Sequence, residues 1–379
     1  MDFKYHLPTK IVFGCGKLSE LSGLLEGYGN KGTALIVSGK SAAKKHGYLT
    51  QINKYSKKAG WKTIVFDKIS PNPKSDEVNR AIKKIKKKDG KIICDLIIGL
   101  GGGSAIDAAK AISAGINYDS IDEIIGKTVD NSYLPVIAIP MTSGSGAEVT
   151  KGAIITDTKA KLKTGIRGEA LFPKVAIVDP ELTITMPPKV TAETGFDALT
   201  HAIESYVAKK ASTITDVYSE KAMELIAHNL GRAIKDGSDI EAREKMSLAS
   251  LLSGANIANA SSCLPHRLQQ ALGSVVECSH GGGLAMVYPS WIRHAYPYAK
   301  EKLDNIAKIF GQTDCEKVII DLIKSINIDP RLRDLGVQKN QILQFVDKVS
   351  GNLSNDPMPL EMLEKNDKEL IRKIYEESF

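Results

Sequence analysis

The chain has 379 residues, of which 42% are hydrophobic and 25% charged, a composition typical of a folded protein with room for two sizeable cores. It contains no apolar run of about 18 residues, so neither a transmembrane helix nor a membrane partner is expected. The N-terminal stretch MDFKYHLPTKIVFG lacks a basic region followed by an apolar one, and the five cysteines form no CxxC pair. A reducing, cytoplasmic location is therefore expected.

The net charge of +7 raises the question of a nucleic-acid partner. In the densest basic run, RAIKKIKKKDGK at residues 80–91, Ala81, Ile82 and Ile85 recur at helical spacing, which leaves the lysines on a solvated face. No aromatic residues interleave with them to stack on bases, so no nucleic-acid binding is expected. The positive surplus favours an anionic cofactor or substrate instead.

Up to about residue 182, short strands rich in Val and Ile alternate with helical patterns. The predicted strands are residues 33–39, 62–67, 95–103, 135–140 and 175–180, and the predicted helices are 41–58, 75–88 and 104–115. This alternation predicts a Rossmann-like α/β domain, with a doubly wound parallel sheet covered by helices on both faces.

After the prolines of MPP at 186–188, the pattern becomes helical and strand-like runs nearly disappear. Helical spacing is found at 190–208, 215–234, 241–259, 264–277, 300–310, 316–325, 339–350 and 367–377. We predict a dinucleotide-binding α/β domain over residues 1–182 and an all-α metal- and substrate-binding domain over 183–379. The active site is expected in the cleft between them, because ligands prefer such clefts.

Two glycine-rich turns follow predicted strands of the first domain. In DLIIGLGGGSAIDAAK, glycines 101–103 allow close backbone approach, and Ser104 is expected to N-cap a helix whose start favours a phosphate. The spacing is not a clean GxGxxG and follows the third predicted strand, so a tight turn that merely needs glycine is the alternative. In VIAIPMTSGSGAEVT, Thr142 and Ser143 begin a second nest of small residues, and the two turns together favour dinucleotide binding.

The first predicted strand ends in Ser38, Gly39, Lys40 and Ser41. Sites for NAD usually place an acidic residue beyond this strand to bind the ribose hydroxyls. A basic turn without an acid suits the 2′-phosphate of NADP instead. An ordinary glycine turn with solvated lysines is the alternative.

Four residues in the second half are candidate metal ligands. Asp197 and His201 lie four residues apart in GFDALTHAIESY, which places them on one helix face. His266 opens a helix in PHRLQQALG, and His280 stands in the glycine-rich turn SHGGG. One carboxylate and three imidazoles suit Fe2+ or Zn2+ with an open position for substrate. A helix-start acid and packing or capping histidines are the alternative for each residue.

The motifs GGGSAIDAAK, IPMTSGSGAEVT, GFDALTHAIESY, PHRLQQALG and CSHGGGLAMVYP resemble, in order and spacing, those of the iron-containing (group III) alcohol dehydrogenases. The resemblance covers essentially the whole chain. It implies a divalent metal, Fe2+ or Zn2+, held by Asp197, His201, His266 and His280, and a homodimer. The SGKS turn is similar to the branch that uses NADP and resembles butanol and 1,3-propanediol dehydrogenases, so NADP(H) is expected in preference to NAD(H).

Matched motif by motif, the resemblance implies pyrophosphate binding at residues 101–104 and an adenine-side asparagine at position 72. The full set of candidate cofactor-binding residues is Gly39, Lys40, Ser41, Asn72, Gly101, Gly102, Gly103, Ser104, Asp107, Thr142, Ser143 and Lys163.

The implied reaction is reversible hydride transfer between NAD(P)(H) and a primary alcohol or aldehyde. The alternatives are a dehydroquinate synthase-like lyase, which uses a glutamate where Asp197 stands, and a glycerol dehydrogenase-like enzyme, which usually has fewer histidine ligands. One departure concerns Gln270, which occupies the place of a histidine proposed in many relatives to relay a proton.

Overall fold

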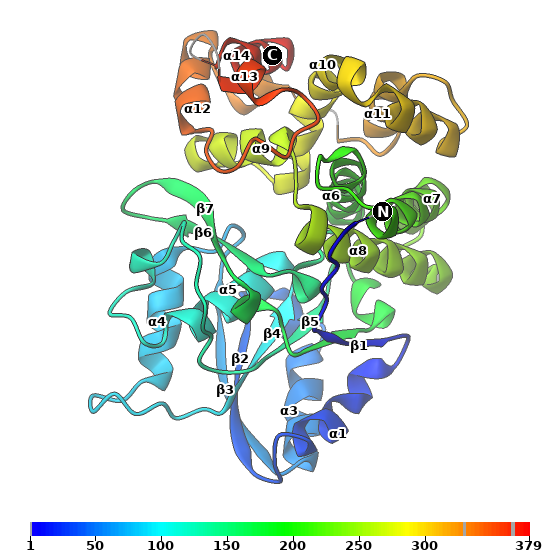
Figure 1. Ribbon diagram of the computed structural model, residues 1–379. Coiled ribbons are helices and arrows are strands. Elements are labelled where there is room, and N and C mark those ends of the chain that lie inside the picture. Colours follow the sequence, from blue (N-terminus) through cyan, green and yellow to red (C-terminus); the bar gives the residue numbers. More distant parts are fainter. Residues whose placement is uncertain (1, 329–330, 365–367) are drawn as a thin grey trace. The chain divides into compact units, whose positions relative to one another are not determined.

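The computed structural model describes residues 2–328, 331–364 and 368–379, and its chain divides into two compact units (Figure 1). Leu7–Thr185 forms an α/β unit. Met186–Phe379 forms a helical unit, to which the N-terminal residues up to His6 also belong. The backbone amide of His6 donates to Asn259 in this helical unit at 2.7 Å.

The α/β unit is built on a parallel sheet of six strands in the order β1-β8-β5-β4-β2-β3. Its strands are β1 (Lys10–Phe13), β2 (Gly32–Gly39), β3 (Trp61–Ile69), β4 (Leu96–Gly101), β5 (Val136–Pro140) and β8 (Val175–Val178). The chain passes from β2 outward to β3 and then returns to the other side of β2 as β4. Ligands of α/β sheets bind at the carboxyl ends of the strands beside such a reversal.

Helices cover both faces of this sheet, as the sequence predicts. They are α1 (Leu21–Glu26), α2 (Ala42–Lys45), α3 (Tyr48–Lys58), α4 (Ser75–Ile85) and α5 (Gly103–Gly115). Side chains alternate along β2, so that Leu35 and Val37 join an apolar core with α4 and α5, whereas Ile36 joins another with α1 and α3. The doubly wound α/β fold is therefore confirmed.

Several elements of this unit differ from the sequence-based prediction. Strand β1 was not predicted, so the strand before the GGGS turn is the fourth of the chain, not the third. The antiparallel pair β6 (Gly152–Asp157) and β7 (Leu162–Arg167) was also missed. The helix predicted over 41–58 is broken by Gly47, whose φ of 76° is left-handed.

The helical unit has one continuous apolar core. Its helices are α6 (Pro188–Val207), α7 (Thr213–Lys235), α8 (Ile240–Ala260), α9 (Leu264–Val275), α10 (His280–Ile309), α11 (Cys315–Ser325), α12 (Ile342–Lys348), α13 (Leu360–Glu364) and α14 (Glu369–Glu377). The all-helical prediction is confirmed here; residue 367 of the predicted last helix lies outside the described residues.

The prediction that His280 stands in a turn was wrong, because α10 begins at His280 and includes the three glycines after it. Ser279 caps this helix, and its hydroxyl accepts the amide of Gly282 at 3.3 Å. Glycine disfavours helix on propensity alone. At Gly281 and Gly283, close neighbours leave no space for a larger side chain.

Candidate active site

Helix α6 carries the acid and the first histidine of the candidate metal site. Pro188 occupies the first turn, where its missing amide hydrogen is tolerated. The helix then continues unbroken for 20 residues, so Asp197 and His201 lie one turn apart on one face, and both are buried.

The other two histidines come from the starts of two further helices. His266 lies in the first turn of α9 and is buried. His280 is the first residue of α10 and is partly exposed, at 32% of its side-chain surface. Of the three histidines, His280 is thus the one with an exposed side, which suits a ligand that must also admit substrate.

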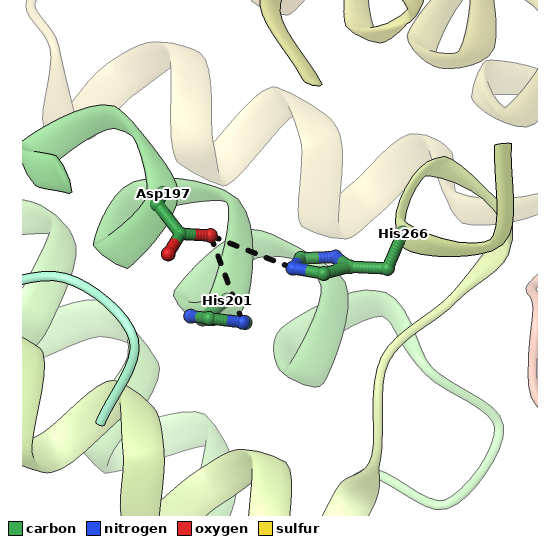
Figure 2. Close-up of side chains that lie close together, drawn as sticks. All are labelled: Asp197, His201 and His266. Atoms are coloured by element: carbon green, nitrogen blue, oxygen red, sulfur yellow. Dashed lines mark ion pairs between the residues drawn. The ribbon is translucent and has the colours of Figure 1, made fainter. Parts of the chain in front are cut away.

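The three candidate histidine ligands converge on one oxygen of the fourth, Asp197. Its Oδ1 atom lies 3.8 Å from Nε2 of His201, 3.6 Å from Nε2 of His266 and 3.4 Å from Nε2 of His280. Figure 2 shows Asp197 and His201 on one helix, with His266 reaching in from another. One ligand atom from each of Asp197, His201 and His266 lies within 4.8 Å of the other two. His280 joins this group through its contact with Asp197.

The residues present fit a divalent metal. Two ligand atoms, each about 2.1 Å from a tetrahedrally coordinated ion, lie about 3.4 Å apart, close to the separations found here. Among the described residues, Oδ1 of Asp197 and Nε2 of His266 are buried atoms that lack a hydrogen-bond partner. Leaving such atoms unsatisfied is costly, and a shared cation would satisfy both.

The electrostatics of the cluster favour a cation as well. Burial raises the pKa of Asp197, but the three neighbouring imidazoles outweigh it and hold that pKa well below its usual value. Burial lowers the pKa of His266, but the carboxyl groups of Glu204 and Asp197 outweigh it and raise the pKa to about 9. Both shifts reflect opposite charges attracting each other within a buried site.

The glycines after His280 allow α10 to begin directly against α6 and α9. A Cβ atom on Gly281 would lie 2.2 Å from the backbone oxygen of Glu193 in α6. A Cβ atom on Gly283 would lie 2.9 Å from Cγ of Gln269 in α9. At both glycines, therefore, the close neighbour is another segment of the chain itself.

Two buried side chains that the sequence analysis did not single out contact the histidines. Glu204 lies 2.7 Å from Nδ1 of His266, and Gln269 lies 2.5 Å from Nδ1 of His280. A signal for Glu204 was present, because it follows Asp197 by seven residues, two helical turns, and so shares its face of α6. Gln270, by contrast, accepts a 3.4 Å hydrogen bond from Arg267 and offers no titratable group at the position of the family's relay histidine.

Asp356 anchors the start of the helix that carries His266. Its carboxyl group accepts the backbone amides of Leu264 and Met358, at 2.9 and 3.1 Å, and the indole of Trp291 at 3.1 Å. Burial nevertheless raises its pKa from 3.8 to about 6, because these hydrogen bonds only partly offset the loss of water around the charge.

This raised pKa predicts a pH-dependent difference in stability between the protein and its Asp356→Asn variant. A carboxyl group whose pKa is higher folded than unfolded stabilises the fold fully below pH 3.8, and this contribution is lost as the pH rises through about 6. The free energy of unfolding, relative to the variant, should therefore fall by roughly 2.4 kcal/mol between pH 4 and pH 7. Urea unfolding in a Trp61→Phe background, followed by Trp291 fluorescence, measures it; parallel pH curves for the two proteins would contradict the assignment.

The predicted coenzyme turns lie side by side at the carboxyl edge of the parallel sheet. Gly101 ends β4 and is paired with Pro140 at the end of β5, and the amide of Met141 donates to the oxygen of Gly101 at 2.9 Å. On the other side, β4 pairs with β2, which ends at Gly39. The three turns therefore meet beside the point where the strand order reverses.

This adjacency leaves little room for a side chain at two glycines of the GGGS segment. A Cβ atom on Gly102 would lie 3.2 Å from the hydroxyl of Thr142, and one on Gly103 would lie 2.6 Å from that of Ser145. The prediction that Ser104 caps α5 was wrong: Gly102 is the N-cap and Ser104 already lies inside the helix. A glycine cap leaves the amides of the first turn accessible, as an anion site requires.

Asn72 and Lys163, distant in sequence, are joined by the fold. Nζ of Lys163, in β7, donates to Oδ1 of Asn72 at 2.8 Å, and Asn72 has a left-handed φ of 54°. Asp107 lies differently, because its oxygens accept the buried Nζ of Lys110 at 3.2 Å and the amide of Ile154 at 3.0 Å. Its carboxyl group thus serves the chain's own donors in this structure.

The remaining candidate cofactor-binding residues lie in the turns after β2 and β5. Gly39 ends the strand, Lys40 is exposed, and Ser41 is the exposed residue before α2. Ser143, after β5, is buried.

Comparisons with known proteins identify the family. Residues 8–180 match "Iron-containing alcohol dehydrogenase" and residues 191–379 match "Fe-containing alcohol dehydrogenase family, C-terminal". The chain therefore belongs to the iron-containing alcohol dehydrogenase family, and it is an NAD(P)-dependent alcohol oxidoreductase. Within the described residues, the structure has no helix that is both long and apolar enough to span a membrane.

Curated relatives and solved structures agree with this assignment. The 1,3-propanediol dehydrogenase of Klebsiella pneumoniae is 31% identical over 100% of this chain and 99% of its own length. The NADPH-dependent butanol dehydrogenase of Clostridium saccharobutylicum is 33% identical, over 98% and 97%, and the NAD-dependent methanol dehydrogenase of Bacillus methanolicus is 33% identical, over 89% and 91%. A crystal structure of 1,3-propanediol oxidoreductase superposes with a TM-score of 0.91 at 31% identity, covering 100% of both chains.

Proposed function

We propose that this enzyme transfers a hydride reversibly between NADP(H) and a primary alcohol or aldehyde, with one divalent ion, Fe2+ or Zn2+, held by Asp197, His201, His266 and His280. The observation that carries the proposal is the convergence of the three imidazoles on Oδ1 of Asp197, with two buried ligand atoms left without partners. The family assignment favours this reaction over a dehydroquinate synthase-like lyase. A glycerol dehydrogenase-like activity would be a different choice of alcohol within the same chemistry.

When bound, the divalent ion supplies a Lewis acid that polarises a carbonyl oxygen or lowers the pKa of an alcohol. The chain's own part is to hold the ligands rigidly. Asp197 and His201 share one helix, and the helix starts of α9 and α10 place His266 and His280. The partial exposure of His280 supports access of the substrate from its side of the cluster.

We further propose that the carboxyl edge of the sheet binds the coenzyme. The amides at the start of α5, at Gly102 to Ser104, would receive the pyrophosphate, with Thr142 and Ser143 in the neighbouring turn. Lys163 would donate to the coenzyme while Asn72 holds its ammonium group in place, as their 2.8 Å contact supports.

The turn of Gly39, Lys40 and Ser41 is the basis for proposing NADP(H) as the preferred coenzyme. A lysine hydrogen-bonded to a 2′-phosphate contributes about 1.5–3 kcal/mol, so kcat/KM should favour NADPH over NADH by about 10- to 100-fold. An aldehyde panel assayed with both coenzymes, with added Fe(II) or Zn(II), tests this. Lys40→Ala should remove most of the preference and Gly39→Asp should reverse it.

Lys57→Ala serves as the control for that test, because Lys57 is an exposed lysine of α3 whose loss changes the net charge equally. A strong preference for NADH in the unaltered enzyme would refute this interpretation of the turn.

We also propose a cytoplasmic homodimer, which is consistent with the five free cysteines and the family resemblance. Light scattering on the purified enzyme measures the oligomeric state.

A further inference from the structure

Behind His266 lies the fully buried carboxyl group of Glu204, which is not one of the four candidate metal ligands. Oε1 of Glu204 lies 2.7 Å from Nδ1 of His266, on the side of the ring opposite Nε2. Its other oxygen accepts the backbone amide of Cys263, also at 2.7 Å. A fully buried carboxylate costs several kcal/mol unless both oxygens are satisfied, and here each has a specific partner.

His280 is supported in the same way by a buried amide. Oε1 of Gln269 lies 2.5 Å from Nδ1 of His280. Gln269 is fully buried, and its Cγ fills the space that a side chain at Gly283 would occupy, since a Cβ there would lie 2.9 Å away. Gly283, the fourth residue of α10, thus makes room for Gln269, which contacts His280 at the start of the same helix.

These contacts determine which ring nitrogen carries the proton. A carboxylate can only accept hydrogen bonds, so in the neutral imidazole that metal binding requires, its partner Nδ1 must be the protonated nitrogen. The lone pair then lies on Nε2, the atom that faces Oδ1 of Asp197 in both histidines. The oxygen of Gln269 imposes the same tautomer on His280.

We propose that Glu204 and Gln269 are positioning residues that fix His266 and His280 as Nδ1-protonated tautomers, with Nε2 presented to the metal. The inference rests on the proposed metal site. Partners of this kind also hold the ring orientation, and losing one typically weakens metal affinity by about 10- to 100-fold. Helix α6 therefore supplies two ligands, Asp197 and His201. Two turns after Asp197 it also supplies Glu204, which supports His266 on α9.

The first test is Glu204→Gln, measured as the affinity of the full-length protein for Zn2+ in competition with a chelator. An amide of the same shape has one acceptor, so either its NH2 group faces Nδ1 of His266 and favours the wrong tautomer, or it opposes the amide of Cys263. The dissociation constant should rise by about 10- to 100-fold. Glu220→Gln is the matched control, because the Glu220 carboxyl group accepts hydrogen bonds from Tyr206 and Asn305 elsewhere in the helical unit. The Zn2+ affinity of this control variant should be unchanged.

The second test compares two substitutions at Gln269. Gln269→Glu keeps an acceptor at Nδ1 of His280 and should bind Zn2+ at least as tightly as the unaltered protein. Gln269→Met fills similar space without an acceptor and should bind about 10-fold or more weakly. A purely structural role would make the two variants alike, and an amide that donates to Nδ1 would make Gln269→Glu the weaker one; either result overturns the proposal for Gln269.

The tautomers themselves are read from 15N shifts of labelled histidine in the Zn2+-loaded protein and in the variants. We expect Nδ1 protonated in both rings, and a changed signal for His266 in Glu204→Gln. Unchanged affinity and shifts in that variant would overturn the role of Glu204, and if the variant does not fold, an Nε2-protonated His266 in the unaltered protein would overturn it. Failure of the unaltered protein to bind Zn2+ or Fe2+ would instead refute the metal site itself.

Discussion

Replacing His266 with alanine is expected to weaken metal binding by more than about 100-fold and to abolish turnover. Loss of a mere supporting partner already weakens metal affinity by about 10- to 100-fold, and here a ligand itself is removed. The change also leaves Glu204 buried without the imidazole that accompanies it at 2.7 Å. Metal content after dialysis and kcat with the preferred coenzyme measure the two effects.

His228→Ala is the matched control for this experiment. His228 lies exposed on α7 of the same helical unit, so its loss should alter neither metal content nor turnover. Full activity of metal-stripped His266→Ala protein would show that catalysis does not depend on this cluster, and would refute the assignment.

Gly281→Ala is expected to destabilise the helical unit by about 1–3 kcal/mol and to weaken metal binding. The new methyl group would lie 2.2 Å from the backbone oxygen of Glu193 and 2.8 Å from its carbonyl carbon. Backbone atoms in the middle of a packed helix cannot yield as a flexible side chain can, so α10 must shift at its start. His280 is the preceding residue and would move with it.

The control is the same substitution at Gly231, which lies inside α7 with open space where a Cβ atom would be placed. Alanine favours helix over glycine by about 0.5–1 kcal/mol, so Gly231→Ala should raise the free energy of unfolding while Gly281→Ala lowers it. Urea unfolding of both variants and their Zn2+ affinities give the comparison. Equal stabilisation by the two changes would mean that α10 does not begin against α6.

The sequence predicted the strands that contain a buried apolar run, such as residues 34–37 of β2 and the whole of β4, because their composition alone distinguishes them. It did not predict β1, whose four residues pair with β8 some 165 positions later. Nor did it identify β6 and β7, which pair with each other and carry polar residues such as Lys163 among the apolar ones. A short strand whose partner lies far along the chain, as for β1, has no sufficient local signal, and the mixed composition of β6 and β7 weakens theirs.

The metal cluster shows the same division. That Asp197 and His201 share a helix face follows from helical periodicity, which is a local property. His266 and His280 became candidates through their local sequence segments, and the family motifs supported them. The convergence of all three imidazoles on one carboxylate oxygen depends on the packing of α6, α9 and α10. So does the placement of Glu204 and Gln269 behind two of those rings.

By itself, the sequence determined the fold class, the helical second half, the family and the set of candidate ligands, because periodicity, composition and motif order are all written along the chain. The tertiary structure decided why the glycines stand where they do. SHGGG is the start of a helix lying against Glu193 and Gln269, and GGGS runs from the end of β4 into the first turn of α5, with Gly102 and Gly103 against Thr142 and Ser145. A glycine is required by whatever occupies the space of its missing side chain, and those neighbours come from segments far along the chain.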